Sequence, residues 1–334
     1  MSKTVLVTGA SGFLGSYIAE QLLKQGYTVR AMVRKTSNRK FLESLSGPEG
    51  GIEFAEGSVE QEGRVDDAVK GVHAIIHSAG LVKARNEAEF FATNVAGTTN
   101  LLDAAKKHAP SLKRFVFISS LAAVGPSPDG TPVASDREPN PVTHYGRSKL
   151  AAERAVRAAK DSLPVTIIRP PLIYGPRDNE TFAFFQSISR GVLPVMGDGK
   201  NTLSVIFAAD AAAACVRAID ADVPSGATFF VDDGEVYVWK DALEDVERAL
   251  GKKAFVRVGL PLGVMRAAAM FSEAYGKLND KAVMLTRDKV NELMQKHWVC
   301  NSTDTRAALG WTPAVKWREG TELAAKWYRA EGWL

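Results

Sequence analysis

Two residue types that can move a proton stand one helical turn apart near the middle of the chain. Tyr145 and Lys149 are four positions apart, so a helix there places both side chains on one face. A nearby ammonium favours the phenolate and lowers the pKa of a tyrosine, which suits proton transfer to or from a carbonyl or hydroxyl oxygen. Such a pair is common by itself, so it predicts an active site only together with further residues.

A pair of serines supplies a second polar group. Ser119 and Ser120 end an apolar run over 115–119, which is typical of a buried strand. In a parallel sheet the carboxyl ends of the strands face the ligand crevice. A serine there can hydrogen-bond a reacting oxygen, although serines at strand ends also stabilise turns.

Glycines recur every third residue near the N-terminus, at Gly9, Gly12 and Gly15. An apolar run over 5–8 precedes them and a helical pattern over 16–25 follows, so backbone N–H groups and a helix dipole would face an anion. Gly9 permits the tight turn, Gly12 lets the backbone approach phosphates, and Gly15 lets the helix pack closely on the strand. The segment predicts a dinucleotide site in preference to an ordinary strand-to-helix turn, although its spacing differs from G-x-G-x-x-G.

The end of the second predicted strand bears on the choice of dinucleotide. An acidic residue there would bind the ribose hydroxyls of NAD. This chain has Arg34 and Lys35 instead, and no carboxylate follows through Asn38. Arg34 can stack on adenine and pair with a 2′-phosphate, and Lys35 adds charge, so NADP is favoured over NAD. The alternative is a solvated basic turn.

Alternating apolar runs and helical patterns must position these residues. The predicted strands are 5–8, 29–33, 52–55, 74–77, 115–119 and 165–169. The predicted helices are 16–25, 65–69, 98–108, 150–159, 209–219, 240–250, 262–278 and 319–328. This order predicts an α/β fold with a doubly wound parallel sheet. Five prolines between 121 and 143 predict a long loop.

We expect two parts in the chain. Residues 1–175 form the dinucleotide-binding domain, to which 203–222 return, and residues 176–334 mainly form a smaller, interleaved substrate lobe. The long helical pattern over 261–278 combines apolar residues with Arg266 and Glu273. It either packs on its own lobe, which is the ordinary case, or lines an apolar pocket or touches a membrane surface.

Composition excludes several classes of protein. The 334 residues include 46% hydrophobic and 24% charged residues, which excludes a largely disordered chain. A net charge of +4 without a basic run argues against a general nucleic-acid binder. Cys215 and Cys300 are too few for a disulfide framework or a zinc site, so we expect no metal and a cytoplasmic location. No uncharged apolar run reaches about 18 residues, so no membrane span is predicted.

Together these motifs resemble an extended short-chain dehydrogenase/reductase over nearly the whole chain. The residues that carry the resemblance are Thr8–Gly15, Asn94, Ser119-Ser120, Tyr145, Lys149 and Arg169-Pro170. The resemblance implies a Rossmann-like fold, an NADP cofactor with NAD as the alternative, and a homodimer that pairs through helices near 87–108 and 145–160.

The resemblance also implies roles for single residues. Tyr145 is the general acid/base, and Lys149 tunes it and holds the nicotinamide ribose. Ser120, the second serine of the pair, orients the substrate oxygen, and Asn94 supports a proton-relay water. The implied cofactor-binding residues are Gly9, Ser11, Gly12, Phe13, Leu14, Gly15, Arg34, Lys35, Ser58, Val59, Ala79, Gly80, Tyr145, Lys149 and Pro171. Ser58 stands where the family often has an aspartate that contacts adenine.

Departures from the family pattern reduce the number of reactions that we expect this chain to catalyse. Sugar-nucleotide dehydratases carry Asp-Glu after the catalytic serine or threonine, whereas this chain has Leu121-Ala122. Epimerases of nucleotide sugars usually have an arginine where this chain has Leu203. Segments after residue 285 are similar to the branch of 3β-hydroxysteroid dehydrogenases, dihydroflavonol reductases and 3-oxo-acid reductases.

We therefore expect an NADP(H)-dependent enzyme that interconverts a secondary alcohol and a ketone on an apolar small molecule. The alternatives are a sugar-nucleotide epimerase that recycles NAD internally and a non-catalytic dinucleotide-binding protein.

Overall fold

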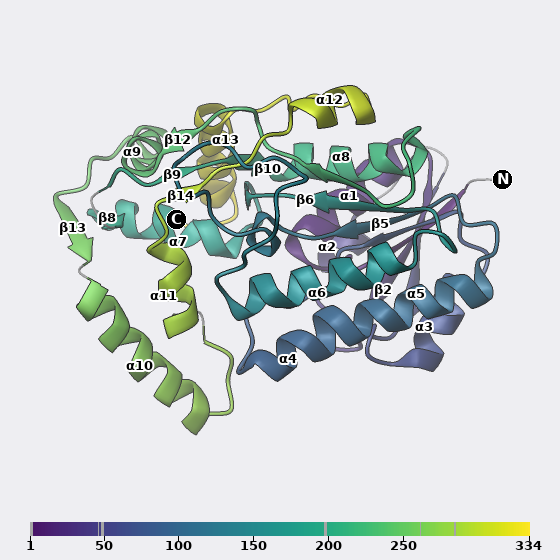
Figure 1. Ribbon diagram of the computed structural model, residues 1–334. Helices are drawn as coiled ribbons and strands as arrows, with labels where there is room; N and C mark the ends of the chain where they lie inside the picture. The colour runs from purple at the N-terminus through teal and green to yellow at the C-terminus, as the bar shows by residue number, and fades with distance from the viewer. Residues whose placement is uncertain (1–2, 46, 48–49, 197–198, 261, 284) are drawn as a thin grey trace.

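A seven-stranded parallel sheet forms the centre of the protein in the computed structural model, which describes residues 3–45, 47, 50–196, 199–260, 262–283 and 285–334. Its strands are β1 (Thr4–Thr8), β2 (Thr28–Val33), β3 (Ile52–Glu56), β4 (Ala74–His77), β5 (Arg114–Ile118), β6 (Val165–Arg169) and β11 (Ala227–Phe230). Their order is β11-β6-β5-β4-β1-β2-β3 (Figure 1). The predicted doubly wound parallel sheet is confirmed, and the strand order reverses between β1 and β4, where such folds bind ligands.

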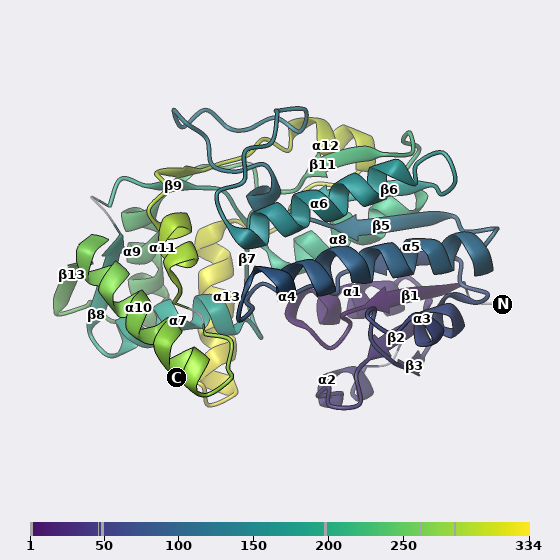
Figure 2. The ribbon, with the colours of Figure 1, turned by 60° about the horizontal axis from the view of Figure 1, so that its bottom comes forward.

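Helices cover both faces of this sheet. The first face carries α1 (Phe13–Lys24), α8 (Ala208–Asp220) and α12 (Thr303–Leu309). The second carries α3 (Glu62–Val69), α5 (Gly97–His108) and α6 (His144–Ala158). A short α2 (Lys40–Glu43) and α4 (Glu87–Phe91) complete this part, and a π-helical turn over Ala92–Ala96 joins α4 to α5. Figure 2 shows α5 and α6 lying side by side.

The predicted elements of the first half differ from the structure mainly at their ends. The helix predicted over 150–159 begins at His144, because the Thr143 hydroxyl accepts from Gly146 N–H and caps it. The predicted loop 121–143 includes one 3₁₀ turn over Leu121–Ala123. Strand β11 was not predicted, since it lies at the edge of the sheet and only one of its four residues is fully buried.

A second group of elements lies beside the carboxyl ends of the central strands (Figure 1). It contains short strand pairs and the helices α7 (Asn179–Ser189), α9 (Trp239–Leu250) and α13 (Trp317–Ala330), which share an aromatic core around Tyr174, Trp317 and Tyr328. The strands are β7 (Leu172–Tyr174) with β10 (Val205–Phe207), β8 (Val192–Met196) with β13 (Val256–Leu260), and β9 (Thr202–Leu203) between β12 (Tyr237–Val238) and β14 (His297–Trp298).

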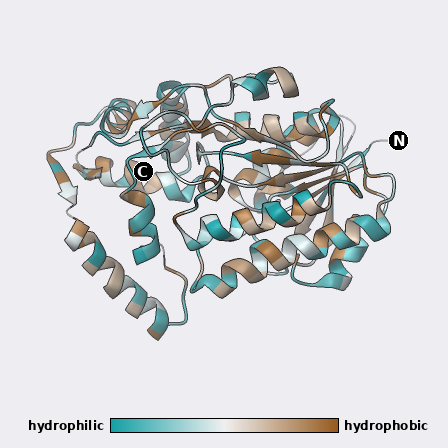
Figure 3. Cartoon of the chain, viewed as in Figure 1, coloured by the Kyte–Doolittle hydropathy of each residue, from teal (hydrophilic) through white to brown (hydrophobic). Residues whose placement is uncertain are grey.

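Two further helices stand at the edge of this second group. They are α10 (Leu262–Leu278) and α11 (Arg287–Leu293), which contact each other through Met265, Ala269 and Val290. The helix predicted over 262–278 has these bounds, and Pro261 lies outside the described residues. Figure 3 shows apolar residues along α10 as well as in the central strands. None of the described helices combines the length and apolar character needed to cross a membrane.

A buried ion pair joins α6 to the central sheet. The fully buried Glu153 of α6 accepts from Arg169 of β6 through both carboxylate oxygens, at 2.8 and 2.7 Å. Ser119, just after β5, donates to the same carboxylate at 2.6 Å. Arg169 also donates to the carbonyl of Ser135. The pair thus fixes α6 against the ends of two neighbouring strands.

We predict that Arg169→Met lowers the free energy of unfolding by about 3–5 kcal/mol, because it leaves the Glu153 carboxylate buried without its main partner. Arg157→Ala is the matched control, since Arg157 contacts the same carboxylate from a half-exposed position. Its cost should stay below about 1 kcal/mol. Thermal unfolding of both variants measures the difference, and equal losses would contradict the role given to Arg169.

Candidate active site

The glycine loop after β1 has the geometry of a backbone cradle. Gly9 has φ +69°, and an added Cβ would lie 2.8 Å from the backbone nitrogen of Ala79. A Cβ on Gly15 would lie 2.1 Å from the carbonyl oxygen of Gly9, so only glycine fits there. Helix α1 begins after Gly12 with no side chain capping its first N–H groups. These groups and the dipole fit an anionic group of a dinucleotide.

Buried His77 braces this loop from β4. The Thr98 hydroxyl donates to the carbonyl of Asn94, so it accepts from Nε2–H of His77 at 2.9 Å. Nδ1 then accepts from the Thr8 hydroxyl at 2.7 Å, and that hydroxyl accepts from Ala79 N–H. Burial lowers the pKa of His77 to about 3, helped by the charge of Lys149. His77 is therefore a neutral link between β1, β4 and α5.

Asn94 joins the loop after β4 to the helix that carries Tyr145. Its Oδ1 accepts from Leu81 N–H at 2.7 Å, and its Nδ2 donates to the Leu81 carbonyl and to the Ser148 hydroxyl. Ser148 in turn donates to the carbonyl of Tyr145. The Asn94 side chain is thus fully used in positioning, inside the π-helical turn before α5.

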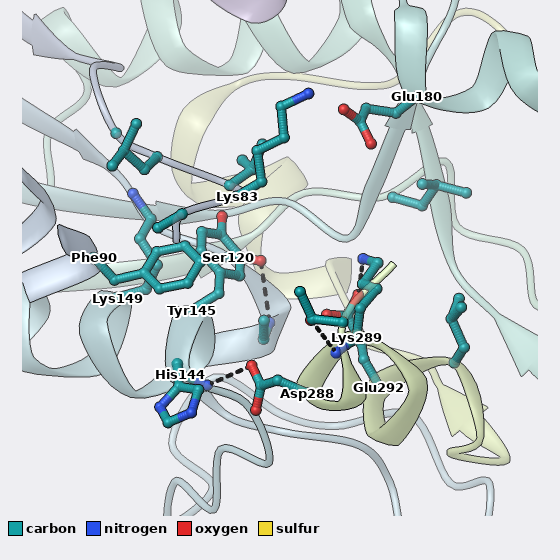
Figure 4. A pocket seen from close by; sticks show the side chains of 18 of the residues that line it. Lys83, Phe90, Ser120, His144, Tyr145, Lys149, Glu180, Asp288, Lys289 and Glu292 are labelled. Atoms are coloured by element: carbon teal, nitrogen blue, oxygen red, sulfur yellow. Dashed lines mark hydrogen bonds and ion pairs between the residues drawn. The ribbon is translucent and has the colours of Figure 1, made fainter. Parts of the chain in front are cut away.

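The two serines after β5 have different surroundings. Ser119 is buried and donates to Glu153, so its hydroxyl belongs to the buried ion pair. Ser120 accepts from Ala122 N–H at 3.1 Å and hydrogen-bonds the side chain of Tyr145. Figure 4 shows Ser120 and Tyr145 side by side at the cavity. Of the two serines, Ser120 is the one placed to reach a bound oxygen.

The expectation that the Lys149 ammonium lowers the pKa of Tyr145 is wrong, because burial outweighs it and the pKa of Tyr145 is raised, while that of Lys149 is lowered. Burial raises the pKa of Tyr145 to about 12, the Ser120 hydrogen bond opposes this, and the charge of Glu292 adds to it. Burial lowers the pKa of Lys149 to about 8, and Glu153 opposes this shift. Lys149 Nζ donates to the carbonyl of Ile118 at 2.6 Å. Tyr145 therefore holds its proton at neutral pH and can donate it.

Helix α11 reaches this centre from the second group of elements. Asp288 accepts from the backbone N–H of His144 at 2.9 Å, at the first residue of α6 (Figure 4). One turn further, Glu292 pairs with Lys289 at 2.6 Å and faces the cavity. Sequence reasoning missed both acidic residues, because 144 positions separate His144 from Asp288 and no local pattern connects them.

A cavity of about 1610 Å³ connects the glycine loop with these helices. The predicted site residues among its lining are Gly9, Gly12, Phe13, Leu14, Gly15, Gly80, Ser120, Tyr145, Lys149 and Pro171. The predicted site residues outside its lining are Ser11, Arg34, Lys35, Ser58, Val59, Ala79 and Asn94. Val59 is buried among the apolar residues of the second face of the sheet, and its carbonyl accepts a hydrogen bond from Asn100.

Arg34 lies beyond the cavity, next to an acidic residue that the sequence did not single out. Glu60 accepts from the hydroxyls of Ser58 and Thr93 and lies 3.9 Å from the Arg34 guanidinium. Position 58 thus has a serine where the family often has an aspartate, and the nearby carboxylate belongs to Glu60, two residues later. Arg34 remains half exposed, so it is accessible to a further anionic partner.

Comparison with known proteins agrees with this geometry. The model of the NAD-dependent epimerase/dehydratase family matches residues 5–231, from β1 to the residue after β11. The chain belongs to this family. The prediction of an extended short-chain dehydrogenase/reductase, and with it of a nucleotide-dependent enzyme, is confirmed.

Relatives that cover nearly the whole chain have several different names. A ceramide reductase of Caulobacter vibrioides is 32% identical over 99% of this chain and 96% of its own length. A UDP-glucose 4-epimerase of Vibrio cholerae is 28% identical, covering 98% and 95%. A 2-alkyl-3-oxoalkanoate reductase of Stenotrophomonas maltophilia is 27% identical, covering 95% and 96%. The relatives thus include lipid-type reductases and a sugar-nucleotide enzyme.

We predict that His77→Gln flattens the pH dependence of stability on the acid side. The folded-state pKa of His77 is depressed, so the wild-type protein loses stability as pH falls from about 6.5 towards 3, where only the unfolded chain gains this proton. The difference in slope between variant and wild type approaches about 1.4 kcal/mol per pH unit. Denaturant unfolding at several pH values measures it, and parallel curves would contradict a neutral His77.

Proposed function

We propose that the protein is an NADP(H)-dependent oxidoreductase that interconverts a ketone and a secondary alcohol on an apolar small molecule, with Tyr145 as the general acid/base. The observation that carries the proposal is the placement of Tyr145 and Ser120 together on a cavity that extends from the glycine loop into the second group of elements. Membership in the NAD-dependent epimerase/dehydratase family supports a nicotinamide cofactor.

The residues have separable roles in this reaction. NADP(H), when bound, supplies or accepts the hydride at the reacting carbon. In the direction of reduction, Tyr145 donates its phenolic proton to the oxygen that develops negative charge. The Ser120 hydroxyl hydrogen-bonds the same oxygen and holds it near the phenol. The Lys149 ammonium offsets the negative charge left on Tyr145.

The substrate side of the cavity combines apolar side chains with many charged ones. Phe90, Phe184 and Trp298 line it, and Lys83 and Glu180 face each other across it (Figure 4). The Lys289–Glu292 pair lies opposite Tyr145. Such a lining favours an apolar molecule that carries polar substituents near the reacting carbon. The ceramide reductase and the 3-oxoalkanoate reductase among the relatives support a long-chain substrate of this kind.

The lining also disfavours the sugar-nucleotide alternative. Leu203, which stands where epimerases of the family usually have an arginine, lines the cavity as a largely buried apolar side chain. Leu121 and Ala122, which replace the acid–base pair of the dehydratases, also line it. A nucleotide diphosphate would lack its charge-assisted partner at the first position.

We predict that Tyr145→Phe lowers kcat at least about a hundredfold for the reduction of a long-chain 3-oxo amide or a ketosteroid, because the proton donor is lost. NADPH binding should stay within about twofold of the wild type. Tyr27→Phe is the matched control, since Tyr27 donates to Asp220 at the surface outside the cavity lining. NADPH consumption and nucleotide fluorescence measure the two quantities. Turnover retained in Tyr145→Phe would refute the proposed mechanism.

Cofactor preference gives a separate prediction for Arg34. Arg34→Ala should weaken NADPH binding by about tenfold or more, since a charge-assisted hydrogen bond is worth about 1.5–3 kcal/mol. NADH binding should change little. Arg39→Ala serves as the control, because Arg39 is a nearby basic residue already paired with Glu56. Unchanged affinity for both nucleotides would assign Arg34 to a solvated turn, and equal losses for both would assign it to a part that NADH and NADPH share. Either result would remove the preference for NADP.

A further inference from the structure

Helix α10 presents an apolar face to solvent. Val264, Phe271, Tyr275 and Leu278 are 57, 78, 58 and 86% exposed. They recur at intervals of three, four and seven residues, which places them on one side of the helix. The buried residues Met265, Ala269 and Gly276 lie on the other side. The exposed face is therefore a continuous apolar strip and not a set of scattered side chains.

A charged stripe separates the buried side from this strip. Arg266, Glu273 and Lys277 follow each other at seven and four residues, so they align along one margin of the helix. Glu273, Gly276 and Lys277 line the large cavity. Helix α10 is thus one wall of the proposed substrate cavity and at the same time carries an uncovered apolar surface. Figures 1 and 2 show it at the edge of the molecule, next to α11.

The segment around α10 is strongly basic. Residues 252–287 contain seven Lys and Arg against two Asp and Glu, which gives a net charge of +5, whereas the whole chain has +4. Both acidic residues are already paired, Glu273 with Arg287 at 2.9 Å and Asp280 with Arg85. The positive charge beside the strip therefore matches an anionic surface. Phe255 and Val256, at the start of β13, are exposed as well.

A second copy of the chain fits this strip poorly. A helix of 17 residues is about 25 Å long and about 10 Å wide, so its face covers about 250 Å². A stable protein interface needs about 800 Å² on each partner. A symmetric pair would also bring two segments of +5 together, and like charges oppose each other across an interface. A lipid surface needs no minimum area of about 800 Å² and brings no second positive segment, because lipids surround any apolar face that inserts among them.

We propose that α10 is an interfacial helix that docks the protein on an anionic lipid bilayer, with Val264, Phe271, Tyr275 and Leu278 inserted among the lipids. The basic residues beside the helix contact the headgroups, and the cavity wall formed by the same helix lies against the membrane surface. That the substrate enters from this surface rests on the proposed function, whereas the membrane contact itself does not.

Vesicle binding tests the membrane contact without any turnover. The full chain is mixed with vesicles of phosphatidylglycerol and phosphatidylcholine, or of phosphatidylcholine alone, and bound protein is measured by flotation. We expect binding to the anionic vesicles that falls as salt is raised. Phe271→Ser with Leu278→Ser should weaken it at least about tenfold, since two large apolar side chains no longer insert. Arg266→Gln should weaken it about fivefold on the anionic vesicles.

Controls separate this inference from misfolding and from the proposed function. Leu323→Ser, an exposed leucine on α13, should bind vesicles like the wild type. The double variant should retain its melting temperature and its NADPH affinity. Tyr145→Phe should bind vesicles normally even though turnover is lost, so the two proposals can fail independently.

Two results would overturn the inference. The first is wild-type protein that does not float with anionic vesicles, or a double variant that floats equally well. The second is a wild-type dimer, seen by light scattering, that becomes a monomer in the double variant, because the strip would then be an interface between copies of this chain.

Discussion

The position of α6 depends on one buried carboxylate. Tyr145, Lys149 and Glu153 follow each other at intervals of four on the same helix, so all three face the sheet. Glu153 binds Arg169 and Ser119 at the ends of β6 and β5, and this fixes how far Tyr145 and Lys149 reach over the carboxyl edge of the strands. The side chains proposed to be catalytic keep their positions because three buried hydrogen bonds to the Glu153 carboxylate anchor their helix.

Burial and distance along the chain explain which parts of the structure could be predicted from the sequence and which could not. Strands β1, β4, β5 and β6 were predicted from apolar runs because both faces of the inner sheet are covered and these strands are buried. Tyr145 and Lys149 followed from local spacing. Contacts such as that between Asp288 and the first N–H of α6 join residues far apart in the chain, and no hydrophobic periodicity predicts such contacts. Most strands of the second group, namely β7, β9, β10, β12 and β14, have only two or three residues, too few for a pattern to emerge.

The two ends of the cavity differ in how they are built. The end beside the glycine loop is formed by β1, β4 and α1. There every polar side-chain atom of His77 and Asn94 has a hydrogen-bond partner within the protein. The end proposed to bind substrate includes α10 and α11, which share a small apolar cluster and the surface ion pair between Glu273 and Arg287.

The nucleotide content of the freshly purified protein tests the central claim, net hydride transfer with NADP(H), most directly. Acid release followed by mass measurement identifies any bound nucleotide. An enzyme that exchanges its cofactor in every turnover should be empty or hold substoichiometric NADP(H), and it should then bind NADPH more tightly than NADH. Stoichiometric, tightly held NAD would contradict the account, since that is what internal redox in a sugar-nucleotide epimerase requires.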